Sequence, residues 1–157
     1  MVTITKNSKG PLVSFLQLTL KDIGLYNDNI DGIFGDNTLK SVIQFQQNSN
    51  LSYDGIVGVN TWTALLPYMR VPTTISYTYD ILSLNIMSLS SKYPFLKTGN
   101  IGESVMGKNI PYIKIGSGNI QVLYVAGTHA NEWITCPILM KFVEDYLDAY
   151  SNGRKNP

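Results

Sequence analysis

The stretch "DGIFGDNTL", from Asp31 to Leu39, returns as "DGIVGVNTW", from Asp54 to Trp62, and decides the fold of the first half of the chain. Both copies have Asp-Gly, an apolar pair, a second glycine and then Asn-Thr before a large apolar residue. Asp-Gly favours a tight turn, because the carboxylate accepts from nearby backbone N–H groups and glycine tolerates a positive φ. The repeat therefore predicts two tight turns, each followed by a short helix.

The residues around the repeat predict short helices on a common apolar core. After Gly10-Pro11, apolar residues recur at helical spacing, at Val13, Leu16, Leu20 and Ile23. Proline suits a first helical turn, and Gly24 is placed to end the helix. We expect the Asn-Thr pairs at 37–38 and 60–61 to cap the helices that follow them. Residues 6–70 thus predict a small all-helical unit.

The first half of the chain resembles the peptidoglycan-binding domain found on many bacterial cell-wall hydrolases. The doubled Asp-Gly-x-x-Gly carries the resemblance, together with Phe45-Gln46 and Thr61-Trp62. The resemblance implies a non-catalytic three-helix module whose partner is bacterial peptidoglycan. We place its wall-binding region near three residues of the repeat turns, Asp31, Tyr53 and Asp54.

The second half of the chain has a different pattern of apolar residues, which predicts strands as well as helices. The stretch "RVPTTISYT", Arg70 to Thr78, reads as a linker, so we expect a domain over 1–70, a linker over 71–78 and a second domain over 79–157. In the second domain we expect a helix capped by Asp80, a short strand near 110–115 and a strand over 120–127 buried on both faces. A last helix has Pro137 in its first turn and ends at Gly153. The fold class is two-part, a small three-helix domain followed by a partial α/β domain.

The segment "GTHANEWIT", Gly127 to Thr135, contains the one histidine of the chain, His129, with Glu132 three residues later. The pair is either half of a metal site or a satisfied histidine beside a solvated carboxylate, and the residues alone leave both interpretations open. A turn after the carboxyl end of a buried strand is where α/β proteins place their sites. A spacing of three lets both side chains converge on a cation, and zinc accepts imidazole and carboxylate ligands.

The same segment, followed by "PILMKFVEDYL", resembles the first metal-binding motif of the zinc carboxypeptidase family. The upstream stretch "YPFLKTGNIGESVMGKNIPYIKIGSG" resembles the part of that family before its first strands. The resemblance implies zinc as the cofactor, His129 and Glu132 as two of its ligands, and a metallopeptidase activity. Asn131 stands where many digestive members have arginine. This favours the bacterial branch that hydrolyses γ-D-glutamyl–diaminopimelate bonds in peptidoglycan stem peptides.

The family also uses a second histidine as third zinc ligand and a glutamate as general base, both from far downstream. The chain has no second histidine, so its zinc site is incomplete and we assign no catalytic residue. We expect a C-terminally truncated chain that is inactive alone. Three hypotheses remain: a peptidase that recruits a ligand from a partner, a non-catalytic peptidoglycan-binding protein with a vestigial peptidase segment, and a fragment of the parent enzyme. We favour the third for family function and the second for this polypeptide unaided.

Composition and the N-terminal sequence bear on the remaining questions of partners, redox state and localisation. Twelve basic and eleven acidic residues argue against nucleic-acid binding, and we expect no membrane span. Cys136, the single cysteine, excludes an internal disulfide and reads as a buried inert thiol. The N-terminus lacks the layout of a secretion signal, which fits a wall or spore-associated enzyme made in a mother cell, or a phage lysin. The oligomeric state is left open. We expect residues 76–157 alone to be unstable, because strand 121–126 would lack neighbours, while residues 1–70 fold independently.

Overall fold

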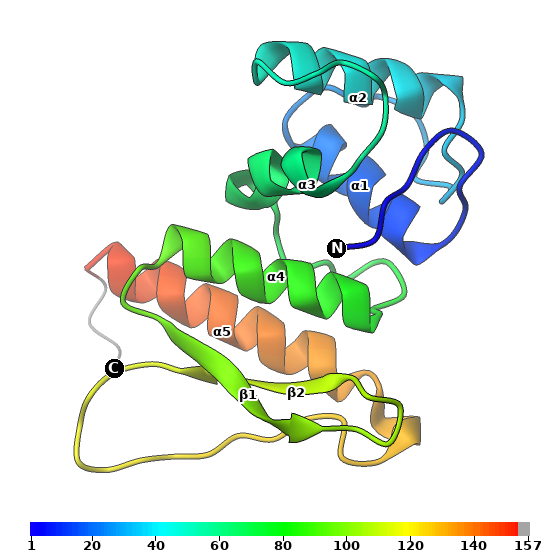
Figure 1. Cartoon of the computed structure of the whole chain (residues 1–157). Coiled ribbons are helices and arrows are strands. Elements are labelled where there is room, and N and C mark those ends of the chain that lie inside the picture. Colours follow the sequence, from blue (N-terminus) through cyan, green and yellow to red (C-terminus); the bar gives the residue numbers. More distant parts are fainter. Residues whose placement is uncertain (154–157) are drawn as a thin grey trace.

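In the computed structural model, which describes residues 1–153, the chain forms a helical part followed by an α/β part (Figure 1). The last four residues of the expected 79–157 domain lie outside the described residues. The helical part contains α1 (Pro11–Asp22), α2 (Asp36–Asn48), α3 (Val59–Leu65) and the 3-10 helix η1 (Leu66–Tyr68). The second part contains α4 (Tyr79–Lys92), β1 (Lys97–Glu103), β2 (Asn109–Lys114), the 3-10 helix η2 (Ala130–Glu132) and α5 (Thr135–Ser151). The predicted two-part fold class is confirmed.

Helices α1 to α3 pack around one core, as the repeat predicts. Pro11 stands at the start of α1, and Gly24, with φ of +75°, follows its last turn. Trp62 is fully buried, and its indole Nε1 donates to the carbonyl of Val2 at 2.8 Å. The N-terminal segment is held further by an isolated β-bridge between Ile4 and Val57. The three-helix unit is therefore closed by the residues that precede its first helix.

The two repeat turns form as expected, but their Asn-Thr pairs do not cap helices. Asp31 and Asp54 each accept from the backbone N–H two residues later, at 2.9 and 2.8 Å. Helices α2 and α3 begin after glycines, with no side-chain cap. Thr38 and Thr61 are buried instead. Their hydroxyls face inward because each hydrogen-bonds to a buried glutamine, as described below.

Helix α4 lies between the helical part and α5 (Figure 1). Its first half contributes Ile81 and Leu84 to the core of α1 to α3. Leu89, from its second half, and Tyr93, the residue that follows it, belong to a second core shared with α5. The expected cap, Asp80, lies inside the first turn; the N-cap is Thr78, whose hydroxyl accepts from the N–H of Ile81. One helix thus belongs to both cores.

The sheet is an antiparallel hairpin of β1 and β2 that pairs Lys97 with Lys114 at its open end. Strand β2 matches the strand expected near 110–115, and Ile113 and Ile115 pack against the second core. Strand β1 was not predicted, because its sequence KTGNIGE is polar, glycine-rich and exposed at every position. It therefore lacks the apolar pattern by which strands are predicted from sequence.

The strand expected over 120–127 is wrong. These residues form no strand, and their apolar side chains are exposed: Ile120, Val122, Leu123, Tyr124 and Val125. A buried strand needs partners on both edges, but β1 and β2 pair only with each other. Within residues 1–153 no further strand is present to cover the segment. The last helix, by contrast, has Pro137 in its first turn, and Gly153 follows it with φ of +67°.

Candidate functional site

His129 and Glu132 lie at the turn between the extended segment 120–127 and α5. The Nδ1 atom of His129 is 3.0 Å from Oε1 of Glu132, so the two side chains converge as their spacing indicates. Both remain accessible, with 71% and 47% of their side-chain surfaces exposed. Both side chains are thus accessible from solvent. Their role as metal ligands stays a prediction.

Thr135 holds this turn together. Its hydroxyl donates to the carbonyl of Glu132 at 2.7 Å and accepts from the N–H of Gly127 at 2.8 Å. The N–H of Glu132 donates in turn to the carbonyl of His129 at 3.0 Å. One side chain at the start of α5 therefore ties both ends of the turn. Sequence reasoning missed Thr135, although its place after the motif at a helix start is a signal for such a contact.

The fit of zinc to these residues is partial. Imidazole nitrogen and carboxylate oxygen are suitable donors, and they lie close enough to share one ion. A catalytic zinc site takes three protein ligands, and no group of three histidine, cysteine, aspartate or glutamate residues that could hold a metal occurs among residues 1–153. The described chain therefore brings two candidate ligands together and contains no complete group of three.

Cys136 follows the turn by one residue and is partly buried. Burial raises the pKa of its thiol, which disfavours the thiolate. Its sulfur lies close to Gly127, where a Cβ atom would meet Sγ at 2.7 Å. These contacts support the interpretation of Cys136 as a packing residue.

The candidate wall-binding residues fall into two kinds. Asp31 has a structural role: it accepts from the amide of Gln17 at 2.8 Å, and this bond is the main reason that its pKa is lowered. Asp54 makes the same bond with Gln46 at 3.1 Å. Tyr53 is different, because 64% of its surface is exposed. Structure thus separates a free aromatic side chain from two turn-forming carboxylates.

Two buried glutamines, which sequence reasoning missed, organise the repeat. Gln17 donates to Asp31, to Thr38 at 3.1 Å and to the carbonyl of Ile33 at 3.1 Å. Its Oε1 accepts from the N–H of Gly32 at 2.9 Å. Gln46 repeats these four contacts with the second copy, through Asp54, Ile56, Thr61 and Gly55. The sequence signal for this role is a glutamine on the apolar face of each preceding helix, three or four residues after an apolar residue.

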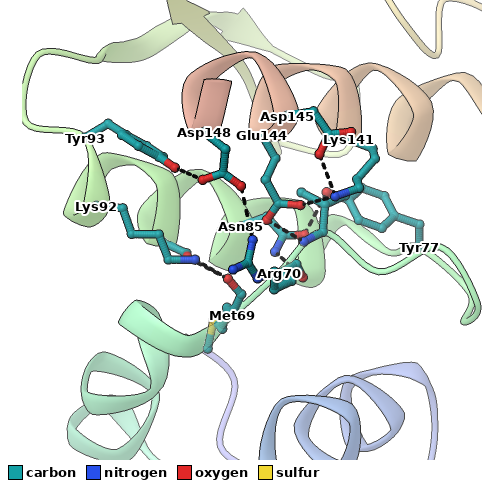
Figure 2. A network of polar contacts seen from close by, with 12 residues as sticks. Met69, Arg70, Tyr77, Asn85, Lys92, Tyr93, Lys141, Glu144, Asp145 and Asp148 are labelled. Atoms are coloured by element: carbon teal, nitrogen blue, oxygen red, sulfur yellow. Dashed lines mark hydrogen bonds and ion pairs between the residues drawn. The ribbon is translucent and has the colours of Figure 1, made fainter. Parts of the chain in front are cut away.

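A polar network joins the two parts of the chain (Figure 2). Glu144 of α5 is almost fully buried and accepts from the N–H of Val71 at 3.1 Å and from Lys141 at 2.8 Å. Arg70 pairs with Asp148 at 3.1 Å. From α4, Lys92 donates to the carbonyl of Met69, and its burial lowers its pKa. The segment expected as a linker is therefore held by α4 and α5.

The glutamate of this network could have been found from the sequence. Glu144 falls between Met140 and Leu147 on the apolar face of α5, and both of these residues are buried. A carboxylate at such a position needs a partner when the helix packs, because an unpaired buried charge is costly. The partner, a backbone N–H from 73 residues earlier, is not visible in the sequence.

Two families match separate segments of the chain. Residues 9–65 match the family of peptidoglycan binding domains. Residues 85–157 match the zinc carboxypeptidase family. The resemblances stated from the sequence are thereby confirmed for both halves, and the first match associates the chain with the bacterial cell wall. Among residues 1–153 no helix has both the length and the hydropathy needed to span a membrane.

Individual relatives and solved structures are similar to parts of the chain. A γ-D-glutamyl-L-diamino acid endopeptidase 1 of Lysinibacillus sphaericus is 47% identical over 77 residues, which are 49% of this chain and 19% of that protein. A peptidoglycan-binding protein of Clostridioides difficile, solved with glutamine hydroxamate, is 41% identical, with a TM-score of 0.39 over 41% of this chain and 40% of its own. The SleB N-terminal domain is 34% identical, with a TM-score of 0.41 over 41% of this chain and 89% of its own.

The chain spans about a fifth of the length of the endopeptidase that it resembles. Its first part carries the helical repeat, and its second part carries the turn with His129 and Glu132. The chain joins a segment that matches peptidoglycan binding domains, residues 9–65, to a segment that matches zinc carboxypeptidases, residues 85–157.

Proposed function

We propose that residues 1–70 hold the chain on peptidoglycan, and that the second part contributes His129 and Glu132 to a zinc peptidase site acting on stem peptides of the same polymer. The bond hydrolysed is the one between γ-D-glutamate and a diamino acid. The observation that carries the proposal is the presence of both matches on one chain, with the His–Glu pair 3.0 Å apart in the second.

The described residues prepare part of such a site. The side chains of His129 and Glu132 are exposed and in contact with each other, and Thr135 fixes the turn on which they stand. When bound in a complete site, zinc lowers the pKa of a coordinated water to near neutrality. In the family that the second part resembles, a second histidine supplies the third ligand, and the 157 residues contain one histidine. On this proposal, the third ligand comes from a polypeptide segment outside them.

A second candidate function is non-catalytic peptidoglycan binding with a vestigial peptidase segment. The observation that favours it is the partial site, in which residues 1–153 provide two ligands but no group of three. Two ligands hold zinc weakly, because most of the coordination sphere is left to water.

Sedimentation with purified sacculi tests both candidates. We expect the chain to cosediment with sacculi, and His129→Ala to cosediment equally but to retain about tenfold less zinc. Glu103→Gln, an exposed acid outside the turn, is the control and should retain zinc like the parent. Released peptides with a free diamino-acid amino group would support the peptidase. Cosedimentation without retained zinc would favour the second candidate, and failure to cosediment would overturn both.

A further inference from the structure

The two repeats differ at the place where each glutamine meets its turn. In the first repeat Tyr26 covers Gln17: its hydroxyl accepts from the Gln17 amide at 3.1 Å and donates to the carbonyl of Asn29 at 2.8 Å. Tyr26 is 4% exposed, so the ring closes this side of the repeat. The loop that carries Tyr26 runs from the glycine after α1 to Asp31 and has room to fold back over the glutamine.

The second repeat has no counterpart of Tyr26. The loop from Asn50 to Asp54 is shorter, and Gln46 has no tyrosine among its partners in the described residues. A cleft of about 190 Å³ lies against Gln46 instead. Its lining is mainly polar and includes Gln46, Ser52, Asp54, Asn60 and Thr61.

The equivalent asparagines show the same difference. Asn37 of the first repeat donates to Asp28 at 2.8 Å. Asn60 lines the cleft, and no hydrogen bond occupies its side chain within residues 1–153. Tyr53, between the lining residues Ser52 and Asp54, is 64% exposed. The second repeat therefore presents an open amide and a carboxylate in the cleft, and an exposed aromatic side chain on the residue between two of its lining residues.

We propose that this cleft of the second repeat is a binding site for the neutral sugar backbone of peptidoglycan, and that the first repeat is closed to ligand by Tyr26. The proposal rests on the proposed wall-binding function and deepens it. Amide and carboxylate groups suit sugar hydroxyls and N-acetyl groups, and an exposed aromatic ring suits the apolar face of a sugar. The lining contains an acid and no basic residue, which disfavours the carboxylate-rich stem peptide.

Amide chemical shifts of the full chain distinguish the two ligand classes. The probes are a tetrasaccharide of N-acetylglucosamine and the free tripeptide L-Ala-γ-D-Glu-diaminopimelate. We expect the tetrasaccharide to shift the amides of Ser52 to Thr61, with no comparable shifts over residues 28–38. Shifts of the cleft by the tripeptide alone, equal shifts in both repeats, or no shifts with either probe would each overturn the proposal.

Matched variants test the same cleft on intact sacculi. Asn60→Ala and Tyr53→Ala should each weaken binding about tenfold, whereas Asn37→Ala, at the equivalent position of the closed repeat, should change it less than about twofold. Ser52→Tyr fills the cleft and removes no hydrogen bond seen in the structure, so it should abolish binding with an unchanged melting temperature. Sacculus binding that survives both Asn60→Ala and Ser52→Tyr would overturn the cleft while leaving wall binding itself in place.

Discussion

The amide of Gln17 donates to the carboxylate of Asp31 at 2.8 Å, joining the middle of α1 to the turn that precedes α2. Gln46 and Asp54 repeat this bond between α2 and the turn that precedes α3. Each glutamine also accepts from the glycine N–H of its turn, at 2.9 Å in both cases. The helical part is therefore held by two buried glutamine–turn contacts of the same kind inside an apolar core. Each glutamine satisfies backbone groups that its turn leaves without partners.

Gln17→Leu removes the hydrogen bonds between Gln17 and the first turn without removing much side-chain volume. The N–H of Gly32 loses its buried acceptor, so the free energy of unfolding should fall by about 3 kcal/mol. Gln47→Leu, an exposed position on α2, is the control and should change it by less than about 0.5 kcal/mol. Urea denaturation followed by tryptophan fluorescence measures both, and equal midpoints for the two variants would contradict the structural role of Gln17.

Glu144→Ala tests the network that joins the two parts. The N–H of Val71 then lacks an acceptor in a buried place, and we expect a loss of about 3 kcal/mol in unfolding free energy. Hydrogen exchange at the Val71 amide should accelerate in the variant. Asp145→Ala removes the neighbouring exposed partner of Lys141 and should cost less than about 0.5 kcal/mol. Unchanged exchange at Val71 in Glu144→Ala would show that this contact does not hold the segment.

Alkaline pH should weaken the second core through Tyr93. Burial and the hydrogen bond to Asp148 raise the pKa of Tyr93 to about 12, from an ordinary value of 10.0. The folded state binds this proton more tightly, so its contribution is complete below pH 10 and is lost as the pH rises through 12. Tyr93→Phe lacks this titration, and its unfolding free energy should fall less steeply over the same range. Parallel pH profiles for the two proteins would refute this linkage.

The exposed segment 120–126 should drive self-association. Leu123 is 85% exposed in the middle of a run of apolar side chains, which is a typical aggregation surface. Leu123→Lys should lower the aggregated fraction in sedimentation velocity and leave the melting temperature unchanged, because the side chain has no packing to lose. Leu123→Ile keeps the apolar surface and should aggregate like the parent. If both variants aggregate equally, another surface is responsible.

The sequence was informative where the relevant contacts are local. The Asp-Gly turns and Pro11 at a helix start follow from the conformational preferences of a few adjacent residues, and the structure has all of them. The Asn-Thr caps failed because Thr38 and Thr61 find buried glutamine partners from a preceding helix. Such partners depend on tertiary packing, which local preferences do not encode.

The second part was harder to predict for a related reason. The apolar run at 120–127 has the composition of a buried strand, but a strand forms only where neighbouring strands accept its hydrogen bonds. The convergence of His129 and Glu132 was predictable from their spacing, since Glu132 is three positions after His129 at a helix start. The bond between Val71 and Glu144 joins residues 73 apart and could be learned only from the fold.

Helix α4 takes part in both hydrophobic cores, with Ile81 and Leu84 in one and Leu89 in the other. Because one helix packs into both cores, it fixes the orientation of the second part relative to the first as well as the distance between them. On the proposed function, the sugar cleft and the His129 turn would be held at a set separation and angle. The metal-binding turn would then reach stem peptides only at a constant distance from the sugar that the cleft holds.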